Sequence, residues 1–423
     1  MGRRWMATVA ISLAGLLALS ACGDGEGGND SRRQVAVFSW WTGAGEADGL
    51  KAMRQIFERD NPRLKFFDAA VAGGSGDQAR ALLSSKLNAN QPPDTFQGHA
   101  GAELQGYIKA GKLESLNFLY DELKLKDVFP KQLIDQISVQ GQVYSVPVNI
   151  HRSNVLWFNP SVLKAAGITG PPATIPGFVA ALEKVRAAGK IPLSLGPQWT
   201  AVHLLECVLL GSLGTPAYNR LWTSGSDWSG PEVTKALTDF KTILSYAGDP
   251  VDDWQPAARQ VADGEAAFMI MGDWAYGYFH NPPDGGLGKV SRTDFDWAPS
   301  PGTDGTFMWL SDSFTLPRGA PSRDGAVAWL KVAASREGQD AFNPLKGSIP
   351  ARTDADKSLY KDYLKWNLSQ WATSKLAGSI QHGVVANDNW RTAINDAVGL
   401  FQQDLDVADF QQALVEAAKN SGQ

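Results

Sequence analysis

Residues 35–46 read VAVFSWWTGAGE, and the rest of the chain is organised around this stretch. A short apolar strand runs into Trp40 and Trp41, a glycine-rich turn follows, and an amphipathic helix with Leu50 on its apolar face begins. Strand, turn and helix in this order form the first half of a βα unit. Ligands of open α/β sheets bind outside the carboxyl ends of the strands, which is where Trp40, Trp41 and Glu46 fall.

Two large aromatic rings followed by a carboxylate suit a ligand with apolar C–H faces and hydroxyl edges. This combination describes a sugar. In the alternative interpretation, Trp40 and Trp41 both belong to the core. Because neighbouring strand residues point to opposite faces of a sheet, that alternative requires both faces to be covered.

The length and composition of the chain narrow the class of protein. A chain of 423 residues is too long for one ordinary core, so two domains or one interrupted domain are expected. With 43% hydrophobic and 20% charged residues, the chain has the composition of a soluble globular protein. The net charge of -5 and the absence of a long basic run argue against a nucleic-acid partner. The 15 tryptophans favour stacking surfaces.

The N-terminus, residues 1–22, has the features of a lipoprotein signal peptide. An apolar run from Met6 to Ala18 follows two arginines and is shorter than the roughly 20 residues that a membrane span needs. Residues 19–22, Leu-Ser-Ala-Cys, resemble a lipobox. We therefore expect cleavage before Cys22 and attachment of lipid to it, by either the general or the twin-arginine secretion route.

This anchor has two consequences. Residues 23–33, which are small and polar, are expected to form a flexible tether that holds the protein at the outer side of the cytoplasmic membrane. If Cys22 carries lipid, only Cys207 remains, and no intrachain disulfide can form. Stability must then come from packing.

The chain continues with alternating strands and helices, which indicates parallel βαβ architecture. Residues 64–70 are predicted to form a strand and residues 77–88 a helix. A further short strand then ends at Gln97 and His99, the second group of candidate ligands. A lone histidine is more often structural, so His99 is a candidate because of its place at an equivalent strand end.

Trp274 repeats the local pattern of Trp41 in what is predicted to be the second domain. An apolar strand over residues 266–271 is followed by a glycine and by this aromatic residue at the start of a helix. Trp254 begins the preceding helix, where burial against that helix and contact with a ligand are both open.

Three polar residues in the last third of the chain complete the candidates. Asp312 lies in a predicted strand over residues 307–317, where an unbonded carboxylate would cost several kcal/mol. Lys346 ends a helix, where it is either a ligand contact or a partner of the helix dipole. His382 lies in an apolar loop.

Catalytic motifs are weak in this chain. The glycines after Trp41 depart from a dinucleotide fingerprint because Asp48 stands where the third glycine should be. There is no phosphate-binding loop and no nucleophile elbow, and the five histidines show no metal-ligand pair at helical spacing. No cofactor or metal is therefore expected. A glycosidase needs two carboxylates flanking one bond, and Glu46 with Asp312 leaves that alternative open.

Taken together, these motifs resemble the family 1 extracellular solute-binding proteins of ABC sugar importers, and most nearly the glucose- and mannose-type monosaccharide binders. The motifs are the lipobox, Ser39-Trp40-Trp41, Glu46, Gln97-x-His99, Gly264-Glu265-Ala266-Ala267-Phe268-Met269 with Gly272-Asp273-Trp274, Asp312, Lys346 and His382. The resemblance spans nearly the whole mature chain.

The resemblance implies a fold of the type II periplasmic-binding-protein kind, with two α/β lobes joined by a hinge and the sugar in the cleft between them. Residues 34–147 and about 307–352 are expected to form the N-terminal lobe. Residues 148–306 and about 353–423 are expected to form the C-terminal lobe.

The resemblance also implies which residues bind the sugar. Trp41, with Trp40 as the alternative, and Trp274 would stack on the pyranose ring, with Trp254 nearby. The expected hydroxyl ligands are Glu46, Gln97, His99, Asp312, Lys346 and His382.

The implied protein is a monomeric lipoprotein that captures a monosaccharide, with glucose as the first choice, and delivers it to an ABC permease without chemistry. Two alternatives stay open: a binder of oligosaccharides or other polyols in the same family, and a secreted glycosidase.

Overall fold

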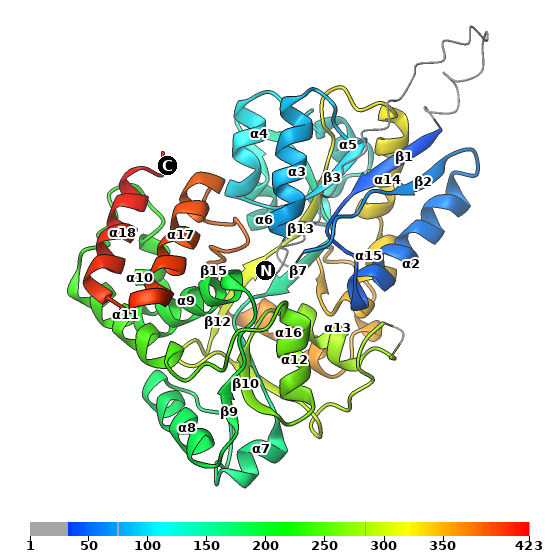
Figure 1. Cartoon of the computed structure of the whole chain (residues 1–423). Coiled ribbons are helices and arrows are strands. Elements are labelled where there is room, and N and C mark those ends of the chain that lie inside the picture. The colour runs from blue at the N-terminus through cyan, green and yellow to red at the C-terminus, as the bar shows by residue number, and fades with distance from the viewer. Residues whose placement is uncertain (1–32, 74–75, 284, 423) are drawn as a thin grey trace, which may run out of the picture.

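The protein was analysed as a computed structural model that describes residues 33–73, 76–283 and 285–422. It is a mixed α/β protein, which confirms the α/β prediction (Figure 1). The predicted signal peptide, the lipidation site Cys22 and nearly all of the tether lie outside the described residues. Within the described part of the chain, no helix has both the length and the apolar character needed to cross a membrane.

The first sheet has five strands in the order β2-β1-β3-β13-β6. The strands are β1 (Gln34–Phe38), β2 (Lys65–Asp68), β3 (Thr95–His99), β6 (Ser145–Pro147) and β13 (Asp312–Thr315). Strand β1 is parallel to β2 and β3, whereas β13 is antiparallel to β3 and β6. The carboxyl ends of β1 and β3 therefore lie at the edge of the sheet where β13 begins.

The second sheet has four strands in the order β11-β8-β10-β9. They are β8 (Val155–Phe158), β9 (Ile191–Leu193), β10 (Ala266–Ile270) and β11 (Asp296–Pro299). Strand β10 is parallel to β9 and antiparallel to β8. This sheet lies at the opposite end of the molecule from the first (Figure 1).

The third sheet lies between the other two and has the order β14-β7-β12-β15. Its strands are β7 (Asn149–Arg152), β12 (Thr306–Leu310), β14 (Ile349–Pro350) and β15 (Lys375–Gly378). The chain passes from β6 into β7 through Val148 and from β12 into β13 through Ser311. The first and third sheets are thus joined twice by nearly continuous strands. A separate hairpin pairs β4 (Ser138–Val139) with β5 (Gln142–Val143).

Helices cover these sheets (Figure 1). Before β8 they are α2 (Ala44–Asp60), α3 (Asp77–Asn88), α4 (Gln105–Lys109), α5 (Asn117–Glu122) and α6 (Lys131–Gln136). Between β8 and β12 they are α7 (Pro160–Ala165), α8 (Ile175–Ala187), α9 (Gln198–Leu213), α10 (Thr215–Arg220), α11 (Pro231–Leu244), α12 (Trp254–Ala262) and α13 (Trp274–His280).

The last helices are α14 (Arg323–Ala334), α15 (Arg336–Lys346), α16 (Tyr363–Thr373), α17 (Asp388–Asp404) and α18 (Val407–Lys419). Short 3₁₀ segments occur at η2 (Ala102–Leu104), η3 (Leu125–Asp127) and η4 (Lys357–Leu359). Helices α17 and α18 pack on α9 and α11, on one side of the molecule (Figure 1).

Local side chains begin several of these helices. The Oδ1 atom of Asn159 accepts hydrogen bonds from the backbone N–H groups of Ser161 and Val162 at the start of α7. Thr174 caps α8 and Asn387 caps α17 in the same way. Each cap satisfies backbone donors that have no partner inside the helix.

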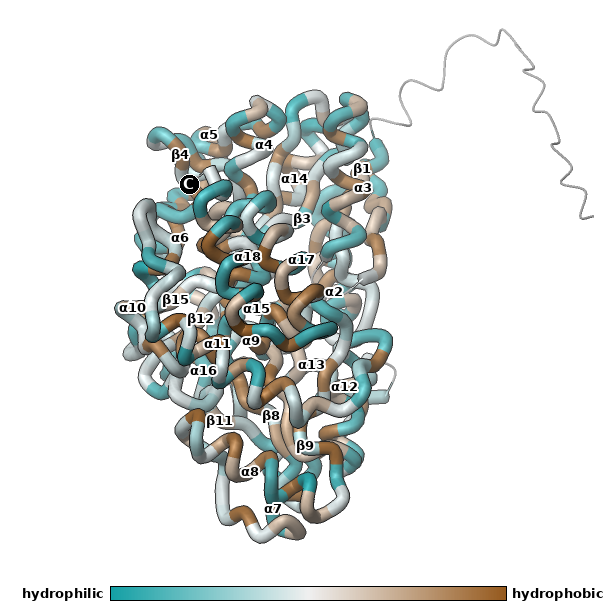
Figure 2. The backbone as a smooth tube through the Cα atoms, turned by 60° about the vertical axis from the view of Figure 1, so that its left-hand side comes forward, coloured by the Kyte–Doolittle hydropathy of each residue, from teal (hydrophilic) through white to brown (hydrophobic). Residues whose placement is uncertain are grey.

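The apolar residues form two buried clusters, and β8 contributes to both. Leu156 and Trp157 are neighbours on this strand, yet they belong to different clusters because successive strand residues point to opposite faces. The indole N–H of Trp157 donates to the carbonyl of Met271 over 3.0 Å, so its one polar atom is satisfied. Figure 2 shows hydrophobic and hydrophilic residues alternating along the helices, as expected for helices with one buried face.

The structure corrects one predicted strand. Residues 307–317 were expected to form a single strand, but they divide at Ser311 into β12 and β13. The reason is their pairing: β12 lies between β7 and β15, whereas β13 lies between β3 and β6. The division of the chain into lobes at residues 147, 306 and 352 stays a prediction, and β12, which that division gives to the first lobe, belongs to the third sheet.

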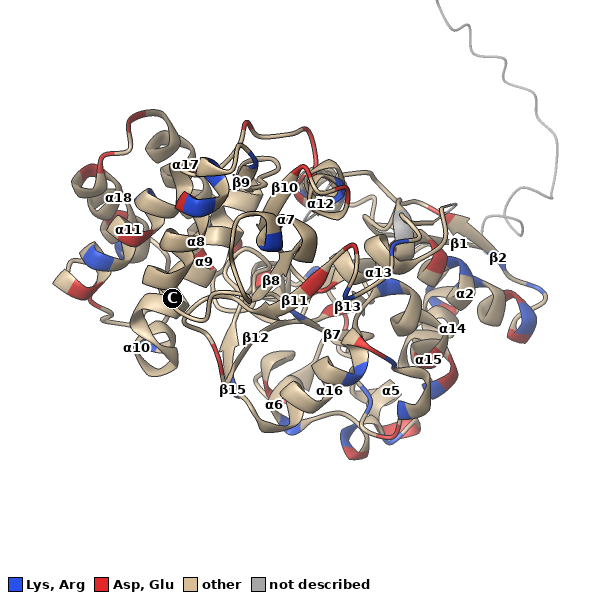
Figure 3. Cartoon of the chain, turned by 90° about the horizontal axis from the view of Figure 1, so that it is seen from below, with Lys and Arg blue, Asp and Glu red and all other residues tan. Residues whose placement is uncertain are grey.

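Charges of both signs are mixed over the surface. Figure 3 shows Lys or Arg beside Asp or Glu on helices such as α2, α15 and α18. One example is Arg59, which pairs with Glu337 over 2.6 Å at the exposed ends of α2 and α15. Exposed pairs of this kind contribute little to stability.

The close approach of α2 to α15 generates a prediction. A Cβ atom on Gly45 would lie 2.0 Å from the carbonyl oxygen of Leu345, so Gly45→Ala should force the two helices apart. We expect the free energy of unfolding to fall by about 1–3 kcal/mol, measured by chemical unfolding. Gly106→Ala in α4 is the control, because no atom lies within 4 Å of the added methyl group. Equal effects of the two substitutions would contradict the packing described here.

Candidate functional site

A cavity lies at the carboxyl ends of β1 and β3, between the first sheet and α13. About 90 Å³ of it is available to the centres of water molecules. Its walls are formed by Trp40, Thr42, Glu46, Ala72, Gly73, His99, His151, Asp253, Trp254, Gln255, Trp274, Leu310, Asp312, Lys346 and His382. Nine of these fifteen residues are buried, whereas Thr42 and Ala72 are exposed, so the cavity opens to solvent on one side.

The sheet topology explains why distant residues meet in this cavity. Trp40 follows β1, His99 ends β3, and Asp312 begins β13. His99 and Asp312 are direct partners in the antiparallel pair of β3 and β13. From the other side, Trp274 is the first residue of α13, which begins four residues after the end of β10.

Trp274 stands among three histidine rings. Its ring centre lies 5.0 Å from that of His382, 5.4 Å from that of His151 and 5.8 Å from that of His203. The rings meet edge to face, the arrangement that aromatic groups prefer. On the opposite wall, Trp40 lies 5.0 Å from His99. The cavity thus has indole rings on both sides.

Asp312 is the centre of the polar network on the first sheet. Its Oδ1 accepts a hydrogen bond from the Gln97 amide over 2.8 Å, and its Oδ2 accepts one from the Asn149 amide over 2.8 Å. The Nε2 atom of His151 lies 3.3 Å from Oδ2. Burial raises the pKa of this carboxyl, but the bond to His151 and the charge of Lys346 lower it further, so the pKa of Asp312 is below its usual range. Asp312 is therefore an ionised acceptor.

His151 connects this network to the start of α13. Its Nδ1 contacts Asp273, the residue before Trp274, and Asp273 also accepts from the backbone N–H of Arg152 over 2.8 Å. Burial lowers the pKa of His151, but the charge and hydrogen bond of Asp273 outweigh it and raise the pKa above its usual value. His151 thus lies between carboxylates on the two sides of the cavity.

Glu46 and Lys346 form an ion pair at the cavity wall. Glu46 lies in the first turn of α2, where the helix dipole favours a negative charge, and Lys346 ends α15. Burial raises the pKa of Glu46 despite this partner. This pair presents a donor and an acceptor side by side at the cavity wall.

His382 is held in the turn after β15. Its Nδ1 lies 2.9 Å from the hydroxyl of Ser379, and the carbonyls of Gly383 and Val384 accept from the backbone N–H groups of Glu103 and Ala102. Burial and the neighbouring histidines hold the pKa of His382 well below its usual value. His382 is therefore a neutral imidazole that can exchange hydrogen bonds with hydroxyl groups.

Three buried side chains next to the cavity have the composition of a metal site. Polar atoms of His203, Glu206 and His382 lie within 4.8 Å of one another. Glu206, however, already accepts hydrogen bonds from two serine hydroxyls and two backbone N–H groups. The fold thus brings together two histidines that lie far apart in the sequence. The Glu206 carboxylate, however, has all these hydrogen-bond donors without an ion.

Eight of the ten predicted binding residues line the cavity. They are Trp40, Glu46, His99, Trp254, Trp274, Asp312, Lys346 and His382. Trp41 and Gln97 do not. The Trp41 ring packs 4.5 Å from Phe342 in the core behind the wall, so the expected order of the tryptophan pair is reversed and Trp40 faces the cavity.

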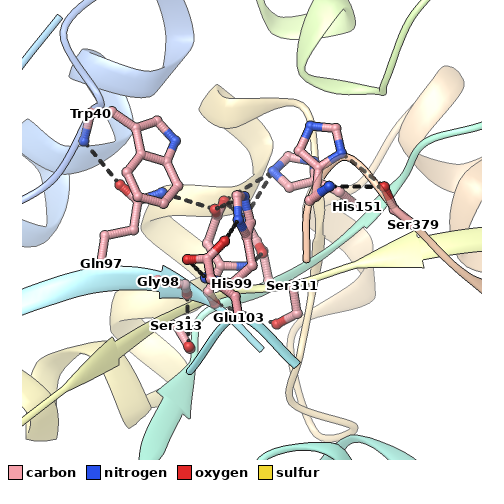
Figure 4. A network of polar contacts seen from close by, with 12 residues as sticks. Trp40, Gln97, Gly98, His99, Glu103, His151, Ser311, Ser313 and Ser379 are labelled. Atoms are coloured by element: carbon pink, nitrogen blue, oxygen red, sulfur yellow. Dashed lines mark hydrogen bonds and ion pairs between the residues drawn. The ribbon is translucent and has the colours of Figure 1, made fainter. Parts of the chain in front are cut away.

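Gln97 stands behind Asp312 and Trp40 and connects them. Its amide nitrogen donates to Asp312, and its Oε1 accepts from the backbone N–H of Trp40 over 3.1 Å. Figure 4 shows Gln97 bonded to the backbone of Trp40. Gln97 therefore orients two cavity residues without being part of the cavity wall.

The sequence reasoning missed His151. Asn149 and His151 alternate with Val148 and Ile150, a period-two pattern that places both polar residues on one face of a strand. That pattern could have identified a further polar strand beside the site. Thr42, Asp253 and Gln255 were also missed, and they lie in turns or at a helix start that carry no comparable pattern.

The chain matches known proteins over most of its length. Residues 52–366 match the family of bacterial extracellular solute-binding proteins. An uncharacterised ABC transporter extracellular-binding protein of Pyrococcus horikoshii is 32% identical over 394 residues, which cover 92% of this chain and 88% of the relative. A protein of Mesorhizobium japonicum named "probable sugar-binding periplasmic protein" is 32% identical over 383 residues, or 87% of this chain and 89% of the relative.

A solved structure shares the fold. The bacterial solute receptor AcbH, which is described as having an exclusive preference for β-D-galactopyranose, superposes with a TM-score of 0.78 at 18% identity and covers 91% of this chain and 97% of its own. This likeness confirms the predicted two-lobed fold of the type II periplasmic-binding-protein kind. The chain therefore belongs to the bacterial extracellular solute-binding proteins, which are receptors rather than enzymes.

Proposed function

We propose that this protein is the sugar-binding subunit of an ABC importer and that it captures a monosaccharide, with glucose as the first candidate. The observation that carries the proposal is the cavity itself. The indole rings of Trp40 and Trp274 form two of its walls. The polar groups of the cavity include Asp312, the pair Glu46–Lys346 and the neutral His382. Aromatic faces suit the C–H faces of a pyranose, and the polar groups suit its hydroxyls.

The size of the cavity supports one sugar ring. The space of about 90 Å³ that is open to water centres is several times what one bound water needs. This supports a small ligand such as one sugar ring, whereas a chain of several rings needs a longer groove. The named sugar-binding relative supports the sugar class but not one epimer.

The charge inventory supports a neutral ligand. Lys346 is paired with Glu46, and His151 lies between Asp273 and Asp312. Among the described lining residues, Lys346 is thus not available to an anionic sugar without giving up its partner. A carboxylate or phosphate on the ligand would be desolvated at a cost that this wall does not offset.

The remaining parts of the proposal rest on the N-terminal sequence and on the family. Extracellular solute-binding proteins act outside the cytoplasm. We infer a lipid anchor at Cys22, a tether over residues 23–33, and a monomer that presents its loaded, closed form to membrane permease subunits. Lobes formed by residues 34–147 with about 307–352, and 148–306 with about 353–423, would close on the sugar.

The alternative within the family is a receptor for oligosaccharides or another polyol. The glycosidase alternative is set aside, because the relatives are receptors and because Glu46, one of its two required carboxylates, is committed to Lys346.

Calorimetric titration tests the proposal. The chain lacking residues 1–22, refolded to remove carried-over ligand, is titrated with glucose, galactose, mannose, xylose and maltose. We expect tight one-to-one binding of one monosaccharide, and weaker binding of the matching uronic acid by about 2 kcal/mol or more. Preference for maltose would favour the oligosaccharide alternative. Silence of folded protein across the panel would overturn the monosaccharide assignment.

The two neighbouring tryptophans should respond differently to truncation. Trp40→Ala should weaken sugar binding by about 1–3 kcal/mol, because the lost aromatic area faces the cavity. Trp41→Ala should instead lower the free energy of unfolding by about 3–5 kcal/mol, because its ring is core. Titration and chemical unfolding of both variants separate these effects. A greater loss of affinity in Trp41→Ala would contradict the placement of the two rings.

Trp274 and His382 should differ in what they contribute to recognition. Trp274→Ala should weaken the binding of all sugars by about 1–3 kcal/mol, since stacking does not depend on hydroxyl configuration. His382→Ala should change the ranking of epimers, because a polar group aimed at one hydroxyl discriminates against its absence. Titration with glucose and its epimers measures both, and an unchanged ranking in His382→Ala would remove that residue from hydroxyl recognition.

A further inference from the structure

Glu206 is an unusual residue for its place in the chain. It lies in the middle of the apolar helix α9, within the run AVHLLECVLL, and its side chain is fully buried. The nearest basic side chain is His203, whose Nδ1 lies 3.6 Å from the carboxylate. Burial holds the pKa of His203 down to about 4, so this histidine supplies no positive charge near neutral pH. A buried carboxylate without a cationic partner needs hydrogen bonds to offset its desolvation.

Those hydrogen bonds come from the turn that carries His382. The backbone N–H groups of Ile380 and Gln381 donate to Oε2 over 2.7 and 3.1 Å. The hydroxyl of Ser379 lies 2.9 Å from the same oxygen and 3.0 Å from Oε1. Ser153, beside β7, donates to Oε1 over 2.5 Å. Glu206 therefore gathers the donors of residues 379–381 onto one carboxylate.

The same turn places a cavity residue. The hydroxyl of Ser379, fixed by Glu206, accepts from the backbone N–H of His382 over 3.2 Å and lies 2.9 Å from its Nδ1. Glu206 thus fixes the Ser379 hydroxyl, and this hydroxyl in turn orients the imidazole of His382. His382 lines the cavity, whereas Glu206 does not reach it.

We propose that Glu206 is a positioning residue for sugar recognition: it holds the 379–382 turn so that the His382 imidazole faces the ligand. This inference rests on the proposed sugar-binding function. It assigns a role in sugar binding to Glu206, although no residue of its helix, α9, lines the cavity.

The proposal includes a dependence on pH. Burial raises the pKa of Glu206 to about 7, although the bonds from Ser153, Ser379 and the turn lower it in part. Above pH 7 the carboxylate accepts from all its donors. As the pH falls through 7, protonation turns one oxygen into a donor and loosens the turn, so affinity should fall toward acid pH.

The other titratable groups that face Glu206 do not account for such a change. His203 and His382 are neutral in this range because burial lowers the pKa of each. Cys207 and Tyr218 stay protonated because burial raises the pKa of each well above its usual value. His151, elsewhere in the cavity, has a raised pKa of its own and can add a pH dependence. The effect of Glu206 is therefore measured as the difference in the pH dependence of affinity between wild type and a Glu206 variant.

The experiment is a titration of the full mature chain with the monosaccharide found in the panel, from pH 6 to 8, in wild type, Glu206→Gln, His382→Ala and the double variant. Because glutamine has the shape of the protonated acid, the Glu206→Gln variant should bind the monosaccharide about tenfold more weakly than wild type at pH 8. It should also lack the part of the loss of affinity toward acid pH that Glu206 causes in wild type. Glu183→Gln, the same change at an exposed site on α8, is the control and should behave as wild type. Thermal unfolding verifies that each variant is folded.

Two readouts distinguish positioning from a general structural effect. In the His382→Ala background, Glu206→Gln should cost no further affinity, because its effect passes through His382. Equal losses in both backgrounds, or an unchanged affinity in Glu206→Gln, would overturn the proposal.

In the absence of any sugar, the amide resonances of Ile380 and Gln381 in NMR spectra should titrate near pH 7 in wild type and not in Glu206→Gln. If no sugar in the panel binds but these resonances titrate, the proposed ligand class is wrong, whereas the proposal that Glu206 holds the 379–382 turn is supported. If the resonances do not titrate, the proposal that Glu206 holds this turn is wrong.

Discussion

The structure depends on two places where a strand leaves one sheet and enters another. At Val148 the chain passes from the first sheet to the third, and at Ser311 it passes back. Backbone hydrogen bonds hold these crossings side by side: the N–H of Val148 donates to the carbonyl of Asp312 over 2.9 Å, and the N–H of Ala100 donates to that of Ser311 over 2.8 Å. His151 and Asp312 lie within three residues of a crossing. The cavity is therefore built at the junction between the first and third sheets.

Several polar side chains at or beside the cavity are held by their neighbours. Glu46 contacts Lys346, Asp312 accepts from two amides, and Asp273 accepts from a backbone N–H. These bonds orient the side chains before a ligand arrives, which reduces the ordering that binding requires. Gln97 and Glu206 do not line the cavity, but Gln97 donates to Asp312 and Glu206 accepts from the turn that carries His382.

Much of the site could be predicted from local sequence because ligands bind where strands end. Trp40, His99 and Trp274 all follow or end a strand, and the family resemblance added Asp312, Lys346 and His382. The order of Trp40 and Trp41 could not be predicted, because alternation assigns the two rings to opposite faces but does not say which face is covered. Phe342 on α15, which lies 301 residues after Trp41 in the chain, decides it by packing on Trp41.

The sequence alone determined the alternation of strands and helices, the starts of helices that carry their own caps, and the residue types of a sugar site, because these depend on neighbours a few positions away. Only the tertiary structure decided that the strand at 307–317 is two strands in two sheets, that His151 joins the site, and that Glu206 holds the turn of His382. These features arise from hydrogen bonds between segments more than 100 residues apart, such as that between Glu206 and Ile380. No local pattern in either segment specifies its partner, because the donors and acceptors involved are present in every stretch of backbone.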